Sequence, residues 1–230
     1  MQRTLTIIIP AYNEEKKLEA SVEEAMKAAN QTKLLFEIII IDDASSDSTW
    51  DCAESIKNKY SNIKTIKNKI NKGLGGSYKV GLAESNSEFI TWVPADCSHD
   101  HKSLLEAYHC IGDADMIIPL PKNPEVRGLK RRVISQLFTL IINTTNRLHV
   151  PYYNGLTIHR VSLLRKINIE TNSFAFQAEA IVKLIKKGAS YKIVSTFISD
   201  RNEGRSKAFT WKNIASVILA ILSIYKTKNM

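Results

Sequence analysis

The chain has 230 residues, of which 44% are hydrophobic and 24% charged, and its formal net charge is +9. This composition is typical of one globular domain with a substantial core and excludes a disordered or fibrous chain. Three cysteines without a Cys-x-x-Cys pair argue against a disulfide framework or a cysteine-based zinc site, so we expect reduced thiols. A strand pattern stands where a secretion signal would be, and no apolar run reaches the ~18 residues that span a bilayer.

Charge is distributed unevenly along the chain. Residues 1–126 hold 14 Lys and Arg against 19 Asp and Glu, a net charge of −5, whereas residues 127–230 hold 18 against 4, a net charge of +14. A basic second half indicates an anionic partner, such as nucleic acid, anionic lipid or a phosphorylated substrate, or else a solvated basic face. Nucleic acid is disfavoured, because the basic half lacks interleaved surface aromatics.

Short apolar runs alternate with helical patterns in the first half. Strands are predicted over residues 5–10, 36–41, 63–66, 88–93 and 114–119, and helices over 14–29, 48–59, 77–84 and 102–111. This alternation predicts an α/β fold with a mostly parallel sheet and helices on both faces. Polar residues at 12–14, 42–43 and 96 follow three of the strands, so we expect them to converge on one crevice.

The second half has a less regular pattern. We expect an amphipathic helix over 133–142, a strand over 152–159, a helix over 176–187, a strand over 193–198 and an apolar helix over 211–225. Two basic loops, residues 127–132 and 201–207, contain arginines, whose planar guanidinium groups suit phosphate. Together the loops would form a phosphate clamp, whereas separately each is an ordinary solvated face.

Carboxylates follow the second and fourth predicted strands. Asp42 and Asp43 are placed to accept hydrogen bonds from a nucleotide base or ribose, and Asp47 or Ser48 to cap the next helix. Asp96 is a candidate ligand for Mg²⁺ or Mn²⁺, which prefer oxygen ligands and share their sites with substrate phosphates.

Other residues near these carboxylates leave alternatives open. His99 and Asp100 are close enough in sequence to join Asp96 at a metal, but Asp100 fits a helix N-cap equally well and His99 a surface histidine. Gly73–Gly76 precede a helix whose N–H groups can face an anion, although no Walker sequence follows.

Five segments of the chain form a recognisable series: IIIPAYNEE (7–15), EIIIIDDASSDST (37–49), NKGLGGSYKVGL (71–82), PAD (94–96) and DRNEGRSK (200–207). Together they resemble family 2 glycosyltransferases, and within that family the polyprenyl-phosphate sugar transferases of the dolichol-phosphate mannose synthase type. The segments stand in the expected order and cover nearly the whole chain.

The resemblance implies a GT-A fold and a nucleotide-diphosphate-sugar donor, with residues 1–126 binding the nucleotide sugar and 127–230 facing the acceptor and membrane in the same single domain. It implies that Asp96, as the second acid of the DxD motif, holds a divalent metal on the donor diphosphate. Arg131, Arg201 and Lys207 would hold the donor diphosphate and the acceptor phosphate. The donor-binding residues that it implies are Pro10, Tyr12, Glu14, Ile41, Asp43, Ala95 and Asp96.

One position departs from the family pattern, because the first acid of DxD is Pro94 here. Either His99 or Asp100 compensates, or metal binding relies on the donor phosphates, or catalysis has been lost.

The implied acceptor is a polyprenyl phosphate, either undecaprenyl or dolichyl phosphate. Its phosphate is ionised at neutral pH and would attack the anomeric carbon with inversion, without a strong general base. The apolar segments 133–142 and 214–225 would lie in a membrane interface, or else pack as core or dimer helices. We therefore expect a peripheral enzyme on the cytoplasmic face of a membrane, with a homodimer as one option.

Two other functions stay open. A family 2 enzyme that acts on a glycan or other hydroxyl needs a general base, for which Glu179 is the candidate. The loss of one DxD acid also fits a non-catalytic protein that binds nucleotide sugars.

Overall fold

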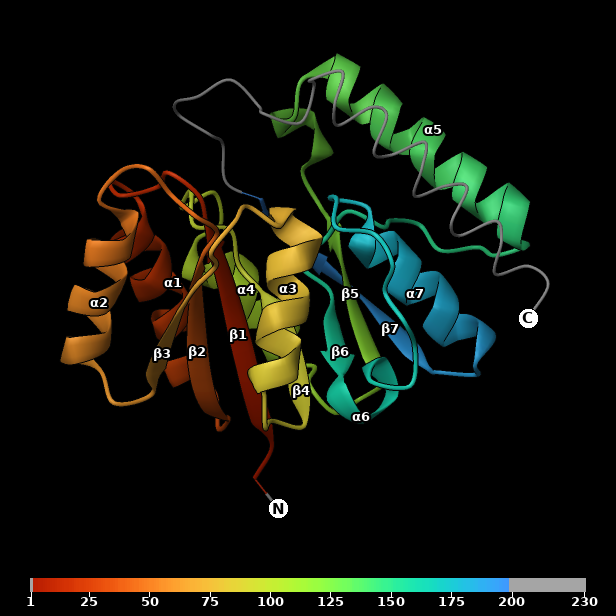
Figure 1. Cartoon of the computed structure of the whole chain (residues 1–230). Coiled ribbons are helices and arrows are strands. Elements are labelled where there is room, and N and C mark those ends of the chain that lie inside the picture. Colours follow the sequence, from red (N-terminus) through yellow and green to blue (C-terminus); the bar gives the residue numbers. More distant parts are fainter. Residues whose placement is uncertain (1, 199–230) are drawn as a thin grey trace.

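The computed structural model describes residues 2–198, in which helices pack on a seven-stranded sheet (Figure 1). The strands are β1 (Thr4–Ala11), β2 (Leu35–Asp42), β3 (Ile63–Lys67), β4 (Phe89–Trp92), β5 (Met116–Pro121), β6 (Ile158–Arg160) and β7 (Tyr191–Thr196). The helices are α1 (Leu18–Asn30), α2 (Thr49–Lys59), α3 (Gly73–Glu84), α4 (His101–Tyr108), α5 (Leu129–Asn146), α6 (Val161–Leu164) and α7 (Phe176–Lys186), with the 3₁₀ helix η1 (Pro124–Val126) before α5.

The strands lie in the order β3-β2-β1-β4-β6-β5-β7. β6 is antiparallel to both of its neighbours, and the other neighbouring strands are parallel. All strands except β6 therefore end at the same edge of the sheet, which we call the carboxyl edge. The predicted α/β fold with a mostly parallel sheet is confirmed, and strands from both sides of residue 126 share this sheet.

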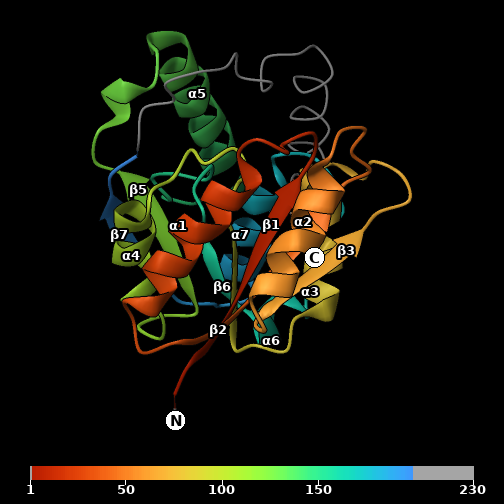
Figure 2. The same ribbon diagram turned by 90° about the vertical axis from the view of Figure 1, so that its left-hand side faces the viewer.

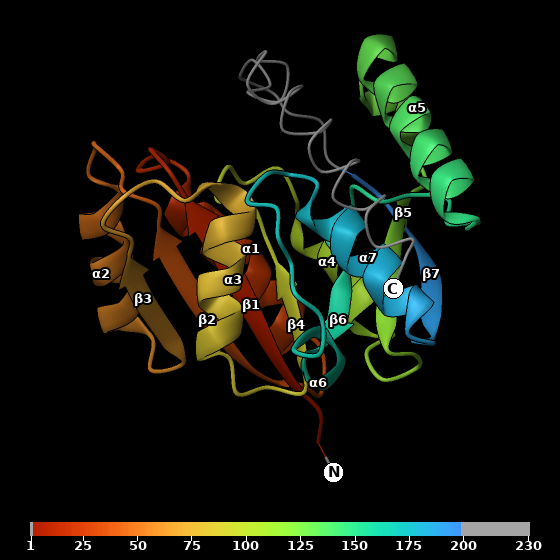
Figure 3. The same ribbon diagram turned by 45° about the vertical axis from the view of Figure 1, so that its right-hand side comes forward.

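Helices cover both faces of the sheet (Figures 2 and 3). α1 packs between α2 and α4 on one face. α3 and α7 meet on the other face, where the ring centroids of Tyr78 and Phe176 are 4.6 Å apart. Because both faces are covered, the central strands are continuous apolar runs, and Ile7–Ile9 and Ile38–Ile41 are fully buried.

The predicted strands of the first half coincide with β1 to β5 to within two residues at each end. The predicted start of the first helix is wrong, because α1 begins at Leu18 instead of Glu14. Residues 12–17 form a turn instead, in which the amides of Lys17 and Leu18 both donate to the carbonyl oxygen of Glu14 at 3.0 Å.

The glycines before the third predicted helix are part of that helix, so its expected start at Ser77 is wrong. α3 begins at Gly73, and a Cβ added at Gly75 would come within 2.8 Å of the carbonyl oxygen of Thr171. These glycines therefore let the first turn of α3 pack directly on the backbone of residues 171–172.

Two predictions in the second half are corrected. Lys130, Arg131 and Arg132 belong to α5, so the basic cluster at residues 127–132 is largely helical and not a loop. The strand expected over 152–159 is reduced to β6, and residues 147–157 form a loop before it. Close packing shapes this loop, because a Cβ at Gly155 would lie 2.8 Å from the carbonyl oxygen of Pro119.

α5 stands above the carboxyl edge, away from the layers that cover the sheet (Figures 1 and 3). Its contact with the body runs through the loop at 147–157: Phe138 meets Tyr153 edge-on at 6.5 Å, and the Asn143 side chain bonds both the amide and the carbonyl of Val150. In the part of the chain that the structure covers, residues 2–198, no helix combines the length and hydropathy required to cross a bilayer.

Candidate functional site

The loops after β1 and β2 are joined to each other by hydrogen bonds. The amide of Asn13 donates to Ser45 Oγ at 3.0 Å, and the Asn13 side chain accepts from the amide of Ser46 at 2.8 Å. The amide of Glu14 donates to Thr49 Oγ1 at 2.8 Å. The two loops therefore form one rigid unit at the carboxyl edge, with Pro10 and Ile41 at its base.

Asp47 also braces this unit. Its carboxylate accepts from the amide and hydroxyl of Thr49 and from the amide of Glu15. Burial raises the pKa of Asp47, but these hydrogen bonds outweigh it and lower the pKa below its ordinary value. Asp47 thus serves the start of α2, as expected, although Ser48 occupies the N-cap position and makes no side-chain bond there.

Asp43 is committed to the loop before α3. Its Oδ1 accepts from Asn68 Nδ2 and the amide of Lys72, and its Oδ2 accepts from the amide of Gly73, all at 2.8 Å. The carboxylate is therefore the anion at the N-terminus of α3, and the glycine amides expected to bind an external anion bind Asp43 and the carbonyl of Asn172 instead.

Asp42 differs sharply from its neighbour. It is fully buried, its Oδ1 accepts a 3.2 Å bond from the amide of Ser45, and its Oδ2 has no partner in residues 2–198. A buried carboxylate oxygen without a partner costs free energy, which identifies Asp42 as a second candidate for ligand contact. Sequence alone does not distinguish the two acids.

Backbone strain accumulates around the crevice. Asn13, Ala44 and Cys97 follow β1, β2 and β4 respectively, and each has a positive φ of 55° to 61°. Such angles are unfavourable for residues other than glycine and cluster at functional sites in proteins. Tyr12 is 45% exposed beside the first of these positions.

The segment after β4 holds the candidate metal ligand. Asp96 Oδ1 accepts from the amide of Ser98 at 3.1 Å, Ala95 is buried, and the carbonyl oxygen of Pro94 accepts from Ser21 Oγ at 2.6 Å. Burial raises the pKa of the Cys97 thiol, which keeps it protonated at neutral pH.

Asp100 has a structural role. Its Oδ1 accepts from the amide of Ser103 at 2.8 Å, which is the N-cap bond of α4. His101 donates its amide to Glu24 and shares a 2.7 Å Nδ1 bond with the same carboxylate oxygen. The N-cap interpretation of Asp100 is confirmed.

A divalent metal fits this site only when phosphate oxygens share it. Asp96 supplies a carboxylate of the type that Mg²⁺ and Mn²⁺ prefer, while Asp100 is taken by the cap. No group of three or more His, Cys, Asp or Glu side chains could hold a metal ion within the stretch from Gln2 to Ile198.

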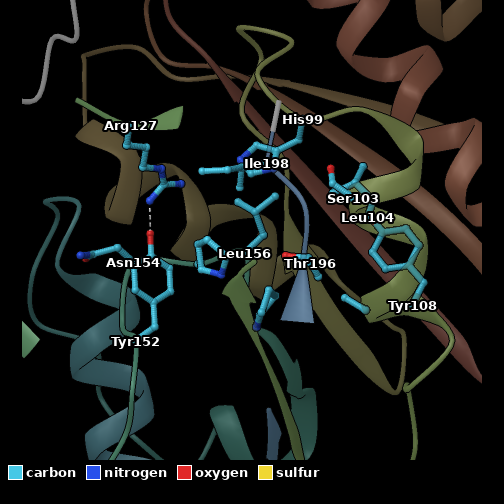
Figure 4. A pocket seen from close by; sticks show the side chains of 14 residues that line it. His99, Ser103, Leu104, Tyr108, Arg127, Tyr152, Asn154, Leu156, Thr196 and Ile198 are labelled. Atoms are coloured by element: carbon cyan, nitrogen blue, oxygen red, sulfur yellow. Dashed lines mark hydrogen bonds between the residues drawn. The ribbon is translucent and has the colours of Figure 1, made fainter. Parts of the chain in front are cut away.

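A pocket opens beside His99 at the carboxyl ends of β5 and β7 (Figure 4). Arg127 lies across it from α4 and donates a hydrogen bond to the hydroxyl of Tyr152, with its guanidinium carbon 5.8 Å from the Tyr152 ring centre. Tyr108 also lines the pocket, and its buried hydroxyl has no hydrogen-bond partner in the described chain. The sequence offered no signal for Tyr152, because the irregular loop at 147–157 brings it to the end of α4, where Tyr108 lies.

The first turn of α5 carries only positive charges. Lys130, Arg131 and Arg132 stand at the positive end of the helix dipole, the turn contains no acid, and Gly128 provides no side-chain cap. Cations at this end are unfavourable, so the arrangement favours an anion bound nearby. Beyond this turn α5 exposes an apolar face made of Leu129, Val133, Ile134, Leu137, Leu140 and Ile141.

Glu179 is a structural residue. It is fully buried in α7, and its carboxylate accepts from the amides of Glu170 and Thr171 and from Lys183 Nζ, at 2.7 to 3.0 Å. This ion pair holds residues 168–171 against α7, so the geometry does not support Glu179 as a general base. Arg201 and Lys207 lie outside the described residues.

Three proteins similar to this chain have names that state an activity or a biosynthetic role. A dolichyl-phosphate β-glucosyltransferase from Dictyostelium discoideum is 39% identical over 105 residues, which are 43% of this chain and 32% of that protein. The minor teichoic acid biosynthesis protein GgaA from Bacillus subtilis is 30% identical over 83% of this chain and 45% of its own length. An undecaprenyl-phosphate mannosyltransferase from Micrococcus luteus is 26% identical over 89% of this chain and 87% of its own. The chain thus spans less than half the length of the first two.

Solved structures share the fold. Glucosyl-3-phosphoglycerate synthase from Mycobacterium tuberculosis, in complex with Mn²⁺, UDP and phosphoglyceric acid, superposes with a TM-score of 0.69 at 15% identity, over 97% of this chain and 78% of the other. The fold is therefore the GT-A fold of such glycosyltransferases. The model of glycosyl transferase family 2 matches residues 6–170, a stretch that includes both acidic loops and Asp96, so the chain belongs to glycosyl transferase family 2.

Proposed function

We propose that the chain is an inverting glycosyltransferase that moves a sugar from a nucleotide-diphosphate sugar to a polyprenyl phosphate at the cytoplasmic face of a membrane. The observation that carries the proposal is α5, where three cations stand at the wrong end of a helix dipole and lead into an exposed apolar face. A lipid phosphate fits both the cations and the apolar face of α5. Its charge offsets the cations, and its hydrocarbon chain covers the apolar side chains. The names of two relatives, which act on dolichyl and undecaprenyl phosphates, support the same acceptor.

The donor would lie across the rigid unit at the carboxyl edge. In this arrangement the exposed Tyr12 would flank the base, Asp42 has a carboxylate oxygen without a partner in the described residues, and Asp43 holds the loop before α3 beside the nucleoside. Asp96 would lie near the diphosphate. Pro10, Glu14, Ile41 and Ala95 complete this side through backbone and packing contacts. The unit is already braced by hydrogen bonds, so binding the nucleoside requires little reordering.

In the transfer step, an oxygen of the acceptor phosphate attacks the anomeric carbon as the bond to the donor diphosphate breaks. The phosphate is ionised at neutral pH, so the nucleophile needs no strong base, which agrees with the buried ion pair of Glu179. Arg131, with Arg201 and Lys207, would stabilise the charge that develops on the leaving diphosphate. A divalent cation bound there would supply further charge stabilisation as a Lewis acid.

A donor screen tests the transfer. Purified protein is mixed with UDP- and GDP-sugars, with and without a short polyprenyl phosphate, and nucleotide release is measured. We expect release that depends on the lipid with one donor, and a decrease of at least tenfold in Arg201→Ala or Lys207→Ala. The matched control is Lys166→Ala, an exposed lysine in the loop after α6, which we expect to retain wild-type turnover. Release only with a glycan or other hydroxyl acceptor would contradict the proposal, as would near wild-type rates in both variants.

Vesicle binding tests the membrane contact separately. Leu137 is 52% exposed in the apolar face, and Gln136 is an exposed polar residue at the edge of that face, one turn before Leu140. We expect Leu137→Glu to weaken binding to anionic vesicles at least tenfold and Gln136→Glu, which adds one charge, to weaken it much less. Equal losses in both variants would show that charge alone drives binding and would contradict the apolar contact.

A further inference from the structure

We propose that the membrane contact extends beyond α5 to a second element, the loop between β3 and α3, which we call the basic tip (residues 67–72). In this contact Ile70 lies in the headgroup layer, and Lys67, Lys69 and Lys72 lie against anionic headgroups. The inference rests on the proposed location at a membrane surface, and it adds an orientation to it. The carboxyl edge of the sheet faces the bilayer, with the crevice between two separate contacts.

The exposed large apolar side chains are concentrated at one edge of the molecule. In residues 2–198, all of them except Leu35, Tyr191 and Ile193 lie at the carboxyl edge or in α5. The two most exposed are Leu129 at 72% and Ile70 at 69%, and they belong to α5 and to the loop before α3, at opposite ends of this edge (Figures 1 and 3). Single exposed apolar residues are ordinary on a protein surface, but their concentration along one edge indicates a binding surface.

The asparagines of the basic tip hold its backbone with Ile70 outward. Asn68 is buried, and its Nδ2 donates to Asp43 Oδ1 at 2.8 Å. Asn71 Nδ2 donates to the carbonyl oxygen of Asp43 at 3.1 Å, and Asn71 Oδ1 accepts from the amide of Gly73 at 3.2 Å. Turning Ile70 inward would break these bonds, so its exposure is built into the loop.

A second exposed apolar side chain belongs to the neighbouring loop, residues 171–175. The amide of Gly75 donates to the carbonyl oxygen of Asn172 at 2.9 Å, so this loop is bound to the first turn of α3, directly after the basic tip. Phe174 lies in this loop and is 50% exposed. The two adjacent loops therefore present an isoleucine and a phenylalanine, which are side chains that suit the interfacial layer of a membrane.

The charge of the two loops favours an anionic membrane over an apolar protein partner. Lys67, Lys69 and Lys72 are exposed, and the loops contain no acid. None of the three ammonium groups forms a salt bridge in the described part of the chain, and Lys67 Nζ lies 5.2 Å from the ring centre of Trp50. Lysines around an exposed isoleucine match anionic headgroups above a hydrocarbon layer. A nucleotide would attract the lysines but would leave the apolar side chains uncovered.

The two contacts would stand on either side of the crevice. The basic tip follows β3 and α5 comes after β5, and in the strand order β3-β2-β1-β4-β6-β5 five spacings of about 4.8 Å put these strands about 24 Å apart. Asp96 follows β4, which lies between them. A bilayer that touches both ends therefore faces the crevice, as the proposed transfer to a lipid acceptor requires.

Added tryptophans test the orientation. Ile70→Trp and its matched control Leu35→Trp each place an indole at an exposed apolar position, but Leu35 begins β2 at the opposite edge of the sheet. The fluorescence of each variant, less that of wild type, is followed while vesicles of phosphatidylglycerol and phosphatidylcholine are added, with and without brominated acyl chains. We expect the emission of Ile70→Trp to shift to shorter wavelength and to be quenched by bromine, and that of Leu35→Trp to do neither.

Two results of this experiment would contradict the orientation. Equal responses in the two variants would overturn the inference, as would no response in Ile70→Trp while the protein binds the vesicles. In either case the proposed contact through α5, which Leu137→Glu tests, would be unaffected. A wild-type protein that binds no vesicles would overturn the proposed membrane location together with this inference.

Charge reversal tests the lysines. We expect Lys69→Glu to weaken vesicle binding about tenfold, and Lys33→Glu, an exposed lysine beside Leu35 at the opposite edge, to weaken it much less. The affinity for UDP and GDP, measured by calorimetry, should be the same in Lys69→Glu and wild type, as should the far-ultraviolet circular dichroism spectrum. If Lys69→Glu lowers nucleotide affinity and leaves vesicle binding unchanged, the lysine serves the donor and the inference is overturned.

Discussion

The two ends of the carboxyl edge are built in opposite ways. Around β1 and β2 the loops are tied by side-chain hydrogen bonds, as between Asn13 and Ser46, and the carboxylates lie beneath them. Around α5 the side-chain hydrogen bonds gather at its second half, where Asn143 holds Val150, while the residues exposed along the helix are apolar and the cations of its first turn stand where the helix dipole disfavours them. The first region is therefore braced by its own side chains, whereas the second exposes an apolar surface. This contrast agrees with the proposal of a nucleotide site at the first region and a lipid site at the second.

Of the two neighbouring acids Asp42 and Asp43, we expect substitution of Asp43 to lower the stability of the first region most. Asp43→Asn places an amide N–H₂ where N–H groups of Asn68, Lys72 and Gly73 now donate, so we expect about 3 kcal/mol of lost stability. Urea denaturation followed by tryptophan fluorescence measures this loss. Asp42→Asn is the matched control, because its Oδ2 has no partner to lose in the described chain.

The two variants together separate structure from ligand contact. We expect Asp42→Asn to keep or raise stability, since it removes a buried charge. If it also keeps full nucleotide affinity, Asp42 makes no contact with the donor. Equal destabilisation in both variants would contradict the assignment of Asp43 as the anchor of the loop before α3.

His159 lies between the two regions, on β6, and predicts a pH dependence of stability. It is fully buried, and burial lowers its pKa to about 4, although a hydrogen bond with Gln177 partly opposes this shift. The unfolded chain takes up a proton near pH 6.5 and the folded protein does not until about pH 4. Stability is therefore retained above pH 6.5 and decreases as the pH falls towards 4, by about 3 kcal/mol in total.

The measurement is the free energy of unfolding at pH 7.5 and pH 5.5, where one such histidine accounts for a loss of about 1.4 kcal/mol. His159→Gln does not titrate and can still bond Gln177, so this part of the slope should disappear. His109 is exposed, and His109→Gln should leave the slope as it is. A slope that persists in His159→Gln would assign it to other groups.

The strands were predictable because isoleucine runs buried on both faces leave few alternatives. The starts of α1 and α3 were not, because contacts far away in the sequence decide them. Glu14 is held in a turn through Thr49, and Gly75 is packed on Thr171. Glycines before a helix usually indicate a loop, but here they allow two backbones to approach.

The sequence allowed the acids and cations of the candidate site to be predicted, but only some of their partners. The cap at Asp100 follows from its position next to a helical pattern, and the structure confirms it. The partners of Asp43 lie 25 to 30 residues further along the chain, and the stacking of Arg127 on Tyr152 depends on an irregular loop. Local patterns contain no information on such pairs, so a prediction from sequence identifies the acids and cations without showing which are already engaged.

Reversing one charge in the first turn of α5 gives the smallest expected effect and tests the second region directly. Arg132→Glu puts an acid near the positive end of the helix dipole, so we expect stability to rise by about 0.5 kcal/mol. Thermal unfolding measures this change. The same reversal at Lys187, the C-cap of α7, should lower stability, because cations are favoured at that end. Binding to anionic vesicles should weaken in Arg132→Glu even as the fold becomes more stable. A loss of stability at both positions would show that Arg132 serves the fold, and the argument for an anion at this helix end would then fail.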